Sequence, residues 1–308
     1  MRILVTGAAG FIGSLLAESL SESHEVIGLD GFLEFPYSAP NKLRNTESFV
    51  KKGINLISAN LCDLSTFKQI PECEAVIHLA AMPGLTLSWE KPELYIENNI
   101  LATANLAKHF EDNQIAKFIF ISTSSVYGKL AIGDENSGLN PISPYGVTKL
   151  AAEKLLLSYH NERNLPLSIL RIFSVFGPRQ RSDMMYSKLF HAAIHKEPIK
   201  VFGDGSQSRT NTYVGDIVDG IKQALYGAKL GEIYNLGGGE EITLNKVMSY
   251  VEEITGEELV KEFVGSQQGD QYRTSADTRK AQDDFGFSPK VRVYEGLEKQ
   301  YNWTMSLL

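Results

Sequence analysis

The sequence predicts a doubly wound α/β domain built on a parallel sheet, followed by a smaller lobe of mixed α+β structure. In the first half of the chain, short runs rich in Val, Ile and Leu alternate with longer segments of helical period. The runs are nearly continuous in apolar residues, which is typical of parallel strands that helices cover on both faces. After about Phe176 the elements become shorter, and the turns Gly203-Asp204-Gly205 and Gly237-Gly238-Gly239 separate them.

Each element follows from its local pattern. Strands are predicted for six β-branched and apolar runs: Ile3–Thr6, Glu25–Leu29, Asn55–Ser58, Ala75–Leu79, Phe118–Ser122 and Leu167–Ile172. Helices are predicted for three segments of helical period: Ile12–Leu20, Glu93–Phe110 and Tyr145–Asn161. Gly177-Pro178 ends this pattern. We therefore expect a first domain over residues 1–176 and a second lobe over 177–308, with a soft boundary because later segments can return to the first lobe.

Composition and charge exclude several classes of protein. The chain has 308 residues, with 30 basic and 37 acidic side chains and a net charge of −7. A nucleic-acid backbone requires a basic face, so we expect no nucleic-acid partner. Cys62 and Cys73 lack the spacing of a disulfide framework or a zinc site, and no metal is implied. No apolar run approaches the roughly 20 residues that span a bilayer, and the N-terminus has no signal-peptide pattern. We expect a cytoplasmic protein without a membrane partner.

A glycine-rich turn after the first strand predicts a dinucleotide site. It reads Thr6-Gly7-Ala8-Ala9-Gly10-Phe11-Ile12-Gly13 and opens the first predicted helix. Glycines at this spacing allow a tight turn and place a pyrophosphate at the helix N-terminus. Asp30 ends the second strand, where a carboxylate accepts hydrogen bonds from both adenine-ribose hydroxyls and repels a 2′-phosphate. The cofactor is therefore expected to be NAD rather than NADP, held in a Rossmann-like domain.

Tyr145, Lys149 and Thr123 form a candidate catalytic group. Tyr145 and Lys149 lie four residues apart on one helix face, after the helix-start signal Ser143-Pro144. Thr123 follows a predicted strand, and ligands bind at the carboxyl ends of parallel strands. A lysine ammonium and an oxidised nicotinamide ring both favour phenolate, so the pKa of Tyr145 is expected well below its usual value of about 10. Tyr145 would then act as general base, with Thr123 sharing the proton of a substrate hydroxyl.

Together these residues resemble an extended short-chain dehydrogenase/reductase, and more narrowly a nucleotide-sugar epimerase/dehydratase. The further motifs are Asp63-Leu64, His78-Leu79-Ala80-Ala81, Asn98 and Ser122-Thr123-Ser124-Ser125-Val126-Tyr127-Gly128. The resemblance covers essentially the whole chain. It implies that Asp63 and Leu64 frame the adenine, while Leu79, Ala80, Ala81 and Asn98 line the path to the nicotinamide.

The second lobe carries motifs that resemble the sugar-nucleotide site of this family. Arg171–Arg181 resembles the stretch that joins the two sites, and Ile199–Gly205, with Val201, resembles the segment around a nucleoside diphosphate. The resemblance implies that Arg209 meets the phosphates and that Asp270 and Arg273 approach the ribose and phosphate. The chain reads Arg209-Thr210-Asn211 where relatives often have Arg-Asp-Phe, and Ser174 where Asn is common.

The residues beside Thr123 separate the reactions known for the family, which all begin by oxidising C4 of the sugar. The 4,6-dehydratases have Asp-Glu where this chain has Ser124-Ser125, and serine has no useful basicity near pH 7. Dehydration and decarboxylation are therefore disfavoured, and 4-epimerisation of a UDP-sugar is expected.

UDP-glucuronate 4-epimerases give the nearest resemblance, carried by Ser124, Ser125, Pro83, Ser174 and Arg181. The three serines and Arg181 can hold a substrate carboxylate away from the orientation in which a β-keto acid loses carbon dioxide. Gly84-Leu85-Thr86 departs from the Gly-Val-Arg of those enzymes. The alternative is a 4-epimerase of UDP-glucose or a UDP-N-acetylhexosamine.

Hypotheses from other classes are a reductase or synthase that consumes NAD(P)H, a non-catalytic NAD-sensing protein and a metal hydrolase. The presence of both Tyr145 and Lys149 argues against the second. The third depends on His191 and His195, which lack the glutamate of an HExxH motif. By family analogy, Glu93–Phe110 and Tyr145–Asn161 are expected to form a homodimer interface.

Overall fold

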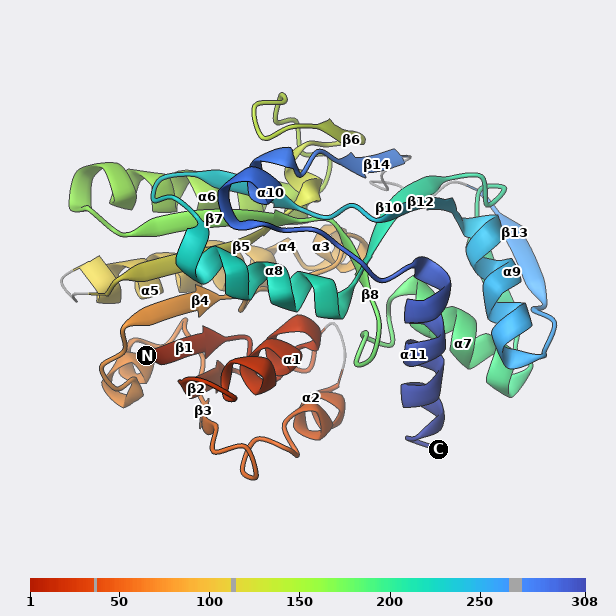
Figure 1. Ribbon diagram of the computed structural model, residues 1–308, viewed down its shortest axis with the longest axis horizontal. Coiled ribbons are helices and arrows are strands. Elements are labelled where there is room, and N and C mark those ends of the chain that lie inside the picture. The colour runs from red at the N-terminus through yellow and green to blue at the C-terminus, as the bar shows by residue number, and fades with distance from the viewer. Residues whose placement is uncertain (36–37, 112–114, 266–272) are drawn as a thin grey trace.

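A seven-stranded parallel sheet forms the centre of the first lobe (Figure 1). The computed structural model describes residues 1–35, 38–111, 115–265 and 273–308. Within them the strand order is β11-β7-β5-β4-β1-β2-β3, and every neighbouring pair is parallel. The strands are β1 (Arg2–Thr6), β2 (Glu25–Asp30), β3 (Asn55–Ser58), β4 (Ala75–His78), β5 (Lys117–Thr123), β7 (Leu167–Ile172) and β11 (Ile233–Leu236). The order reverses between β1 and β4, which makes a crevice for a ligand at the carboxyl ends of the strands.

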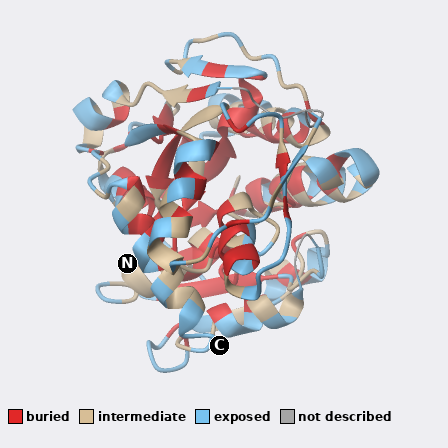
Figure 2. Cartoon of the chain, turned by 90° about the vertical axis from the view of Figure 1, so that its right-hand side faces the viewer, coloured by how far each residue is buried: buried red, intermediate tan, exposed pale blue. Residues whose placement is uncertain are grey.

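The six strands expected from the sequence are confirmed to within one residue at each end, and so is the doubly wound α/β class. Their side chains alternate between two cores. Leu4 and Phe120 pack on one side and Val5 and Ile121 on the other, and all four are buried, as Figure 2 shows for the central strands. This arrangement explains the continuous apolar runs, because both faces of the sheet are covered.

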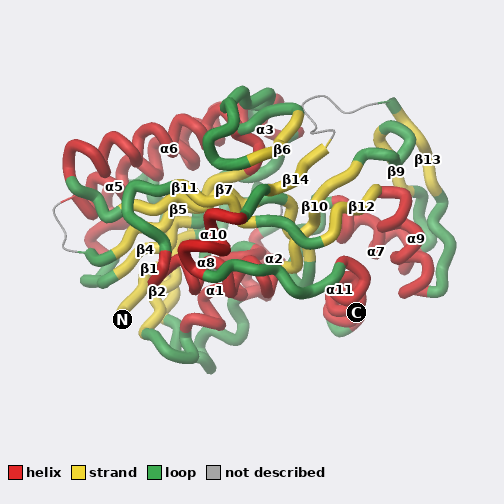
Figure 3. The backbone as a smooth tube through the Cα atoms, turned by 45° about the horizontal axis from the view of Figure 1, so that its top comes forward, coloured by secondary structure: helices red, strands yellow, loops and turns green. Residues whose placement is uncertain are grey.

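Helices cover the two faces of the sheet in separate groups (Figure 3). One group supplies Leu106 and Leu156 to the core that contains Leu4, and the other supplies Leu16 and Ile217 to the core that contains Val5. The first group is α5 (Ala102–Glu111) and α6 (Pro144–Arg163), and the second is α1 (Phe11–Leu20) and α8 (Val214–Gly227). Shorter helices complete the lobe: α2 (Ala39–Asn45), η1 (Leu64–Gln69), α3 (Thr86–Glu90) and η3 (Ser124–Val126).

The helix expected over Glu93–Phe110 is interrupted, and that expectation is corrected here. It consists of α4 (Pro92–Tyr95), a π-helix over Ile96–Leu101 (η2) and then α5. The extra residue in a π-turn rotates the helix, and such turns occur frequently at functional sites. Here the π-helix carries Asn98, which lines the cavity described below, and Asn99, which is fully buried.

The second lobe contains a mixed sheet and a separate strand pair. In the sheet, β8 (Ser174–Phe176) and β12 (Glu240–Thr243) both pair with β10 (Ser208–Tyr213), which also pairs with β14 (Arg273–Ala276), and β14 pairs with β6 (Leu130–Gly133). The separate pair is β9 (Ile199–Phe202) and β13 (Lys261–Val264). Helices α7 (Met185–His195), α9 (Leu244–Thr255) and α11 (Val293–Met305) pack around a core of Phe190, Val247 and Leu297.

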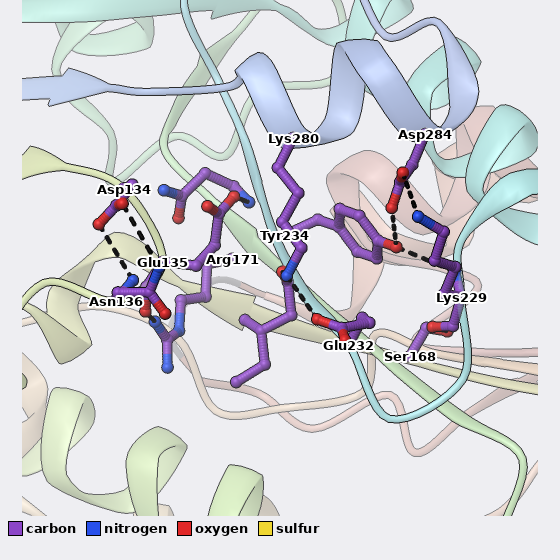
Figure 4. Close-up of polar contacts among 12 residues, drawn as sticks. Asp134, Glu135, Asn136, Ser168, Arg171, Lys229, Glu232, Tyr234, Lys280 and Asp284 are labelled. Atoms are coloured by element: carbon purple, nitrogen blue, oxygen red, sulfur yellow. Dashed lines mark hydrogen bonds and ion pairs between the residues drawn. The ribbon is translucent and has the colours of Figure 1, made fainter.

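The chain returns to the first lobe after residue 213. Helix α8 packs on α1, and β11 then adds the last strand beside β7. Figure 4 shows how α10 (Arg279–Phe285) fastens this strand: Lys280 donates to Glu232, and the Tyr234 hydroxyl donates to Asp284 at 2.8 Å. Residues 214–236 therefore belong to the first lobe in space, although they follow residue 176 in the sequence. Among the described helices, none is both long and apolar enough to cross a bilayer.

Candidate active site

A cavity of about 370 Å³ lies at the switch point of the sheet, between the two lobes. Its walls come from the carboxyl ends of β1, β2, β4, β5 and β7, from α6, and from residues of β8, β10 and the β8–α7 connection. Most of the residues expected to bind cofactor or substrate line it: Gly7, Gly10, Phe11, Ile12, Gly13, Asp30, Leu79, Ala80, Ala81, Pro83, Asn98, Thr123, Ser124, Ser125, Tyr145, Lys149, Ser174, Arg181 and Arg209.

The glycine turn brings backbone close to backbone. A Cβ on Gly7, whose φ is +71°, would lie 2.8 Å from the backbone nitrogen of Ala80. A Cβ on Gly13 would lie 2.1 Å from the carbonyl oxygen of Gly7. Gly10 is the N-cap of α1 and gives it no side-chain hydrogen bond. The first N–H groups of a helix are otherwise without partners, so this arrangement fits a pyrophosphate.

Asp30 is buried at the end of β2 with its carboxylate held in place. Oδ2 accepts from the backbone N–H of Ala9 at 3.0 Å, and Oδ1 accepts from that of Phe32 at 2.8 Å. Burial raises the pKa of Asp30, while these N–H groups and Lys42 oppose the shift. A carboxylate has about four acceptor positions, so two remain for ribose hydroxyls. Lys42 also lines the cavity and donates to the carbonyl of Leu33. It could not be predicted from the sequence, because no pattern sets this lysine apart.

The candidate catalytic pair, Tyr145 and Lys149, lies at the start of α6. Ser143 caps the helix by accepting from the N–H of Gly146 at 3.1 Å, which fixes the first turn that carries Tyr145. Tyr145 and Thr123 share a hydrogen bond. Lys149, one turn later, donates from Nζ to the carbonyl oxygen of Ile121 at 2.7 Å. The structure thus brings together all three residues expected to be catalytic.

The pKa values of the pair differ from the expectation. Burial raises the pKa of Tyr145, whereas the hydrogen bond with Thr123 and the charge of Arg181 lower it by less. Burial lowers the pKa of Lys149 to about 7, against the opposing attraction of Glu153. The expected depression of the Tyr145 pKa is therefore corrected for the protein by itself, because desolvation disfavours the charged form of each residue. A positive ring bound beside Tyr145 would act in the opposite direction.

A buried ion pair connects α6 to the central sheet beside the candidate catalytic residues. Glu153 and Arg171 are 0% and 1% exposed, and they are joined by bonds of 2.7 and 3.0 Å. Ser122, next to Thr123, also donates to Glu153. One carboxylate therefore connects α6 with β5 and β7 beside the cavity.

The substrate end of the cavity is polar. Ser124 and Ser125 are buried, and Thr123 Oγ1 accepts from the N–H of Ser125 at 3.2 Å. Arg181 is 14% exposed and contacts Asp183 through two bonds of 2.9 Å. The Tyr95 hydroxyl lies 2.9 Å from the carbonyl oxygens of Pro83 and Gly84, which fixes that loop.

Several expected site residues lie away from this cavity. Asp63 caps η1 by accepting from the N–H of Ser65, and Leu64 is 69% exposed. Val201 is fully buried in the core of the second lobe, and Arg273 pairs with Glu241 at the surface. Asp270 lies outside the described residues. The binding roles of these five residues stay predictions. Cavity residues that the sequence analysis missed include Asn60, Met82, Phe173 and Met184.

Comparisons with known proteins agree with this site. Residues 3–237 match the model of the NAD dependent epimerase/dehydratase family. A Bacillus subtilis protein named as an uncharacterized UDP-glucose epimerase, YtcB, is 40% identical, with 100% of this chain and 99% of that protein covered. UDP-glucuronate 4-epimerase of Thermodesulfobacterium geofontis is 36% identical, with 98% and 95% covered.

A solved structure extends the likeness to three dimensions. UDP-glucuronic acid 4-epimerase from Bacillus cereus, in complex with UDP-glucuronic acid and NAD, aligns with a TM-score of 0.94 and 39% identity over 100% of both chains. A variant of that enzyme with tyrosine changed to phenylalanine was solved with UDP-4-deoxy-4-fluoro-glucuronic acid and NAD. We conclude from the glycine turn, the Tyr-Lys pair and these matches that the chain belongs to the NAD-dependent epimerase/dehydratase family.

Proposed function

We propose that the protein is an NAD-dependent 4-epimerase that interconverts UDP-glucuronate and UDP-galacturonate. The observation that carries this proposal is the pair of buried serines beside Thr123, together with Arg181, at the substrate end of a cavity that also contains Tyr145 and Lys149. The relatives and the B. cereus structure, with its bound UDP-glucuronic acid and NAD, support it.

The residues around the glycine turn fit NAD. Gly7 and Gly13 leave room for backbone contact with a pyrophosphate, and the buried carboxylate of Asp30 suits a ribose diol. Bound NAD supplies a hydride acceptor for C4 of the sugar and later a hydride donor to the opposite face of the ketone.

The chain's own residues move the proton. Tyr145 takes the proton of the C4 hydroxyl as hydride leaves C4, and the hydrogen bond with Thr123 orients the phenol oxygen. Lys149, anchored on the carbonyl of Ile121, places its Nζ on the same face of α6. When the ketone has turned, Tyr145 returns the proton as hydride is delivered to the other face.

The 4-keto uronate must keep its carboxylate during this turn. Because neither Ser124 nor Ser125 is a base near pH 7, the site lacks the Asp-Glu pair that would remove the C5 proton. A charge-assisted contact from Arg181, with hydroxyls from Ser124, Ser125 and Ser174, can hold the carboxylate out of alignment with the carbonyl. The site therefore favours epimerisation over loss of water or carbon dioxide.

UDP-glucose or UDP-N-acetylhexosamine 4-epimerisation is the second candidate. Gly84-Leu85-Thr86 has no arginine at the loop that lines the substrate end, and Leu85 lies in the cavity wall. The name of the B. subtilis relative is consistent with a neutral sugar.

NMR of the purified protein with UDP-glucuronate, without added cofactor, tests the assignment. We expect UDP-galacturonate with at most a trace of pentose product, because the carboxylate is held away from the orientation in which it is lost. No cofactor need be added, because hydride is taken and returned within one turnover. Tyr145→Phe should retain NAD and lose roughly 10²- to 10⁴-fold in rate, since only the proton acceptor is removed. Conversion of UDP-glucose with unchanged UDP-glucuronate would move the assignment to the neutral sugar. Full activity of Tyr145→Phe would show that another residue is the base.

We also propose that the protein is a homodimer through α6 and the π-helix η2. Large apolar side chains are exposed there: Ile96 at 54%, Leu101 at 47% and Val147 at 51%. Burying such a patch against a second copy would remove it from water. A cytoplasmic location stays a prediction.

A further inference from the structure

The connection between β8 and α7 carries Arg181 to the substrate end of the cavity. This connection, residues 177–184, is called the arginine loop here. In Figure 1 it passes between α1 of the first lobe and α11 of the second. Its position decides where the Arg181 guanidinium lies relative to the catalytic residues of the first lobe.

On the side of the second lobe, buried amides hold the arginine loop. Gln180 and Gln300 of α11 are 6% and 1% exposed, and Gln300 Nε2 donates to Gln180 Oε1 at 2.9 Å. Gln180 Oε1 also accepts from the N–H of Ser187 on α7 at 3.1 Å, and Gln300 Oε1 accepts from the N–H of Gly177 at 3.0 Å. These bonds fix the loop to its own lobe and leave its position over the first lobe to other contacts.

On the side of the first lobe, Arg179 reaches the cofactor helix. Its Nη2 lies 2.7 Å from Oε1 of Glu18 on α1, and the two side chains are 17% and 15% exposed. Glu18 Oε1 also accepts from the hydroxyl of Ser48, so the carboxylate is itself anchored. An ion pair this shielded from water is screened less than a surface pair.

The backbone of Arg179 is strained at the residue that makes this contact. Its φ is +67°, a left-handed conformation that side chains disfavour and that glycine adopts freely. In the described structure, its Nη1 is also buried without a hydrogen-bond partner. Strained backbone persists only where the surroundings hold it, and the ion pair with Glu18 is a contact that can do so.

We propose that Arg179 is a positioning residue, whose ion pair with Glu18 holds the arginine loop against the first lobe and so sets Arg181 at the substrate end of the cavity. Two residues before Arg181, the pair links the helix that begins at the dinucleotide turn to the loop that carries the substrate cation. Without the pair, the Gln180 contacts still hold the loop to the second lobe, and Arg181 can move away from the reacting sugar. The proposal rests on the proposed function for its uronate substrate.

Charge exchange tests the proposal. Arg179→Glu and Glu18→Arg each place like charges together, and the double variant restores an opposite pair. With UDP-glucuronate, we expect each single variant to raise KM at least fivefold and to raise the ratio of pentose to UDP-galacturonate at least fivefold. The double variant should return both to within about twofold of the wild type. A merely structural defect would not change the product ratio and would not be rescued by the exchange.

Two further variants separate loss of the ion pair from backbone strain and from a general effect of removing a surface charge. Arg179→Gly accepts the left-handed backbone without strain, so it should show the same losses as Arg179→Glu while melting at least as high as that variant. Arg279→Glu should match the wild type, because it breaks only the ion pair between the 82%-exposed Arg279, at the start of α10, and Asp277. The proposal fails if Arg179→Glu and Arg179→Gly keep the wild-type KM and product ratio, or if the double variant is no better than the singles. If the wild type converts only UDP-glucose, the uronate assignment fails instead, and KM for UDP-glucose then tests the ion pair in the same variants.

Discussion

Burial shifts the pKa values of the two residues of the candidate catalytic pair in opposite directions. It raises the pKa of Tyr145 and lowers that of Lys149 to about 7, and in both cases it favours the neutral form. Glu153, one turn beyond Lys149, raises the pKa of Lys149 by its negative charge, and it also forms an ion pair with Arg171. Forming the Tyr145 phenolate and the Lys149 ammonium therefore costs free energy before the cofactor and substrate are bound.

Lys149 gives stability a defined dependence on pH. Its pKa is about 7 in the folded protein, against 10.5 in an exposed chain, so between these values the unfolded chain binds more protons. The contribution of Lys149 to stability should therefore rise with pH from 7 toward 10.5, by at most about 1.4 kcal/mol per pH unit. Urea unfolding of the wild type and of Lys149→Met, from pH 7 to 9.5, measures it.

The free energy of unfolding of the wild type minus that of Lys149→Met should increase across this range. Lys280→Met provides the control, because the Lys280 side chain is 33% exposed and pairs with Glu232. If the free energy of unfolding of the wild type minus that of Lys149→Met stays constant with pH, the pKa of Lys149 is not depressed.

At the scale of elements, the π-helix between α4 and α5 divides two neighbouring asparagines between two tasks. Asn99 is fully buried; its Oδ1 accepts from the N–H of Met82 at 2.7 Å, and its Nδ2 donates to the carbonyl of Met82 at 3.1 Å and to Thr148 at 3.0 Å. Asn98 lines the cavity, and its Nδ2 donates to the carbonyl of Leu94 at 2.9 Å. The helix therefore joins the wall of the cavity to α6.

Substitution of each asparagine should separate these tasks. Asn99→Leu leaves the buried polar groups of Met82 without partners and should destabilise the protein by about 2 kcal/mol. Asn98→Leu should change stability by less than about 0.5 kcal/mol and weaken NAD binding. Urea unfolding and NAD titration of both variants check this. Equal destabilisation by the two would mean that the π-turn does not divide their roles.

Local patterns predicted the strands and the sites that depend on neighbouring residues. The glycine turn, Asp30 and the Tyr145–Lys149 pair are each encoded within a few residues, and each lies at the cavity. The π-turn was missed because no local pattern marks it, and the bonds that hold its Asn99, to Met82 and Thr148, are tertiary contacts. The same holds for the Arg179–Glu18 pair, whose members are 161 residues apart. Strand β11 was missed because Asn235 interrupts the apolar run of its four residues, Ile233–Leu236.

At the scale of the whole molecule, the exposed apolar side chains of η2 and α6 predict the oligomeric state. Sedimentation equilibrium should give twice the chain mass of 34.1 kDa. Leu101→Asp places a charge in the proposed interface and should weaken association at least tenfold. Val260→Asp, at a 54%-exposed apolar residue of the second lobe, should leave the dimer intact. A wild type that sediments as a monomer would remove the homodimer proposal.

The return of the chain to its first sheet has a consequence for synthesis on the ribosome. About 60 residues separate β7 from β11, and they include α7, β9 and β10 of the other lobe. At about 5–20 residues per second, the free edge of β7 waits roughly 3 to 12 seconds for its neighbour to be made. During that interval Ile169 and Leu170 lie on a strand edge without a partner, which is the kind of edge that pairs with other nascent chains. The first lobe, although it begins at residue 2, is completed only after much of the second has been translated.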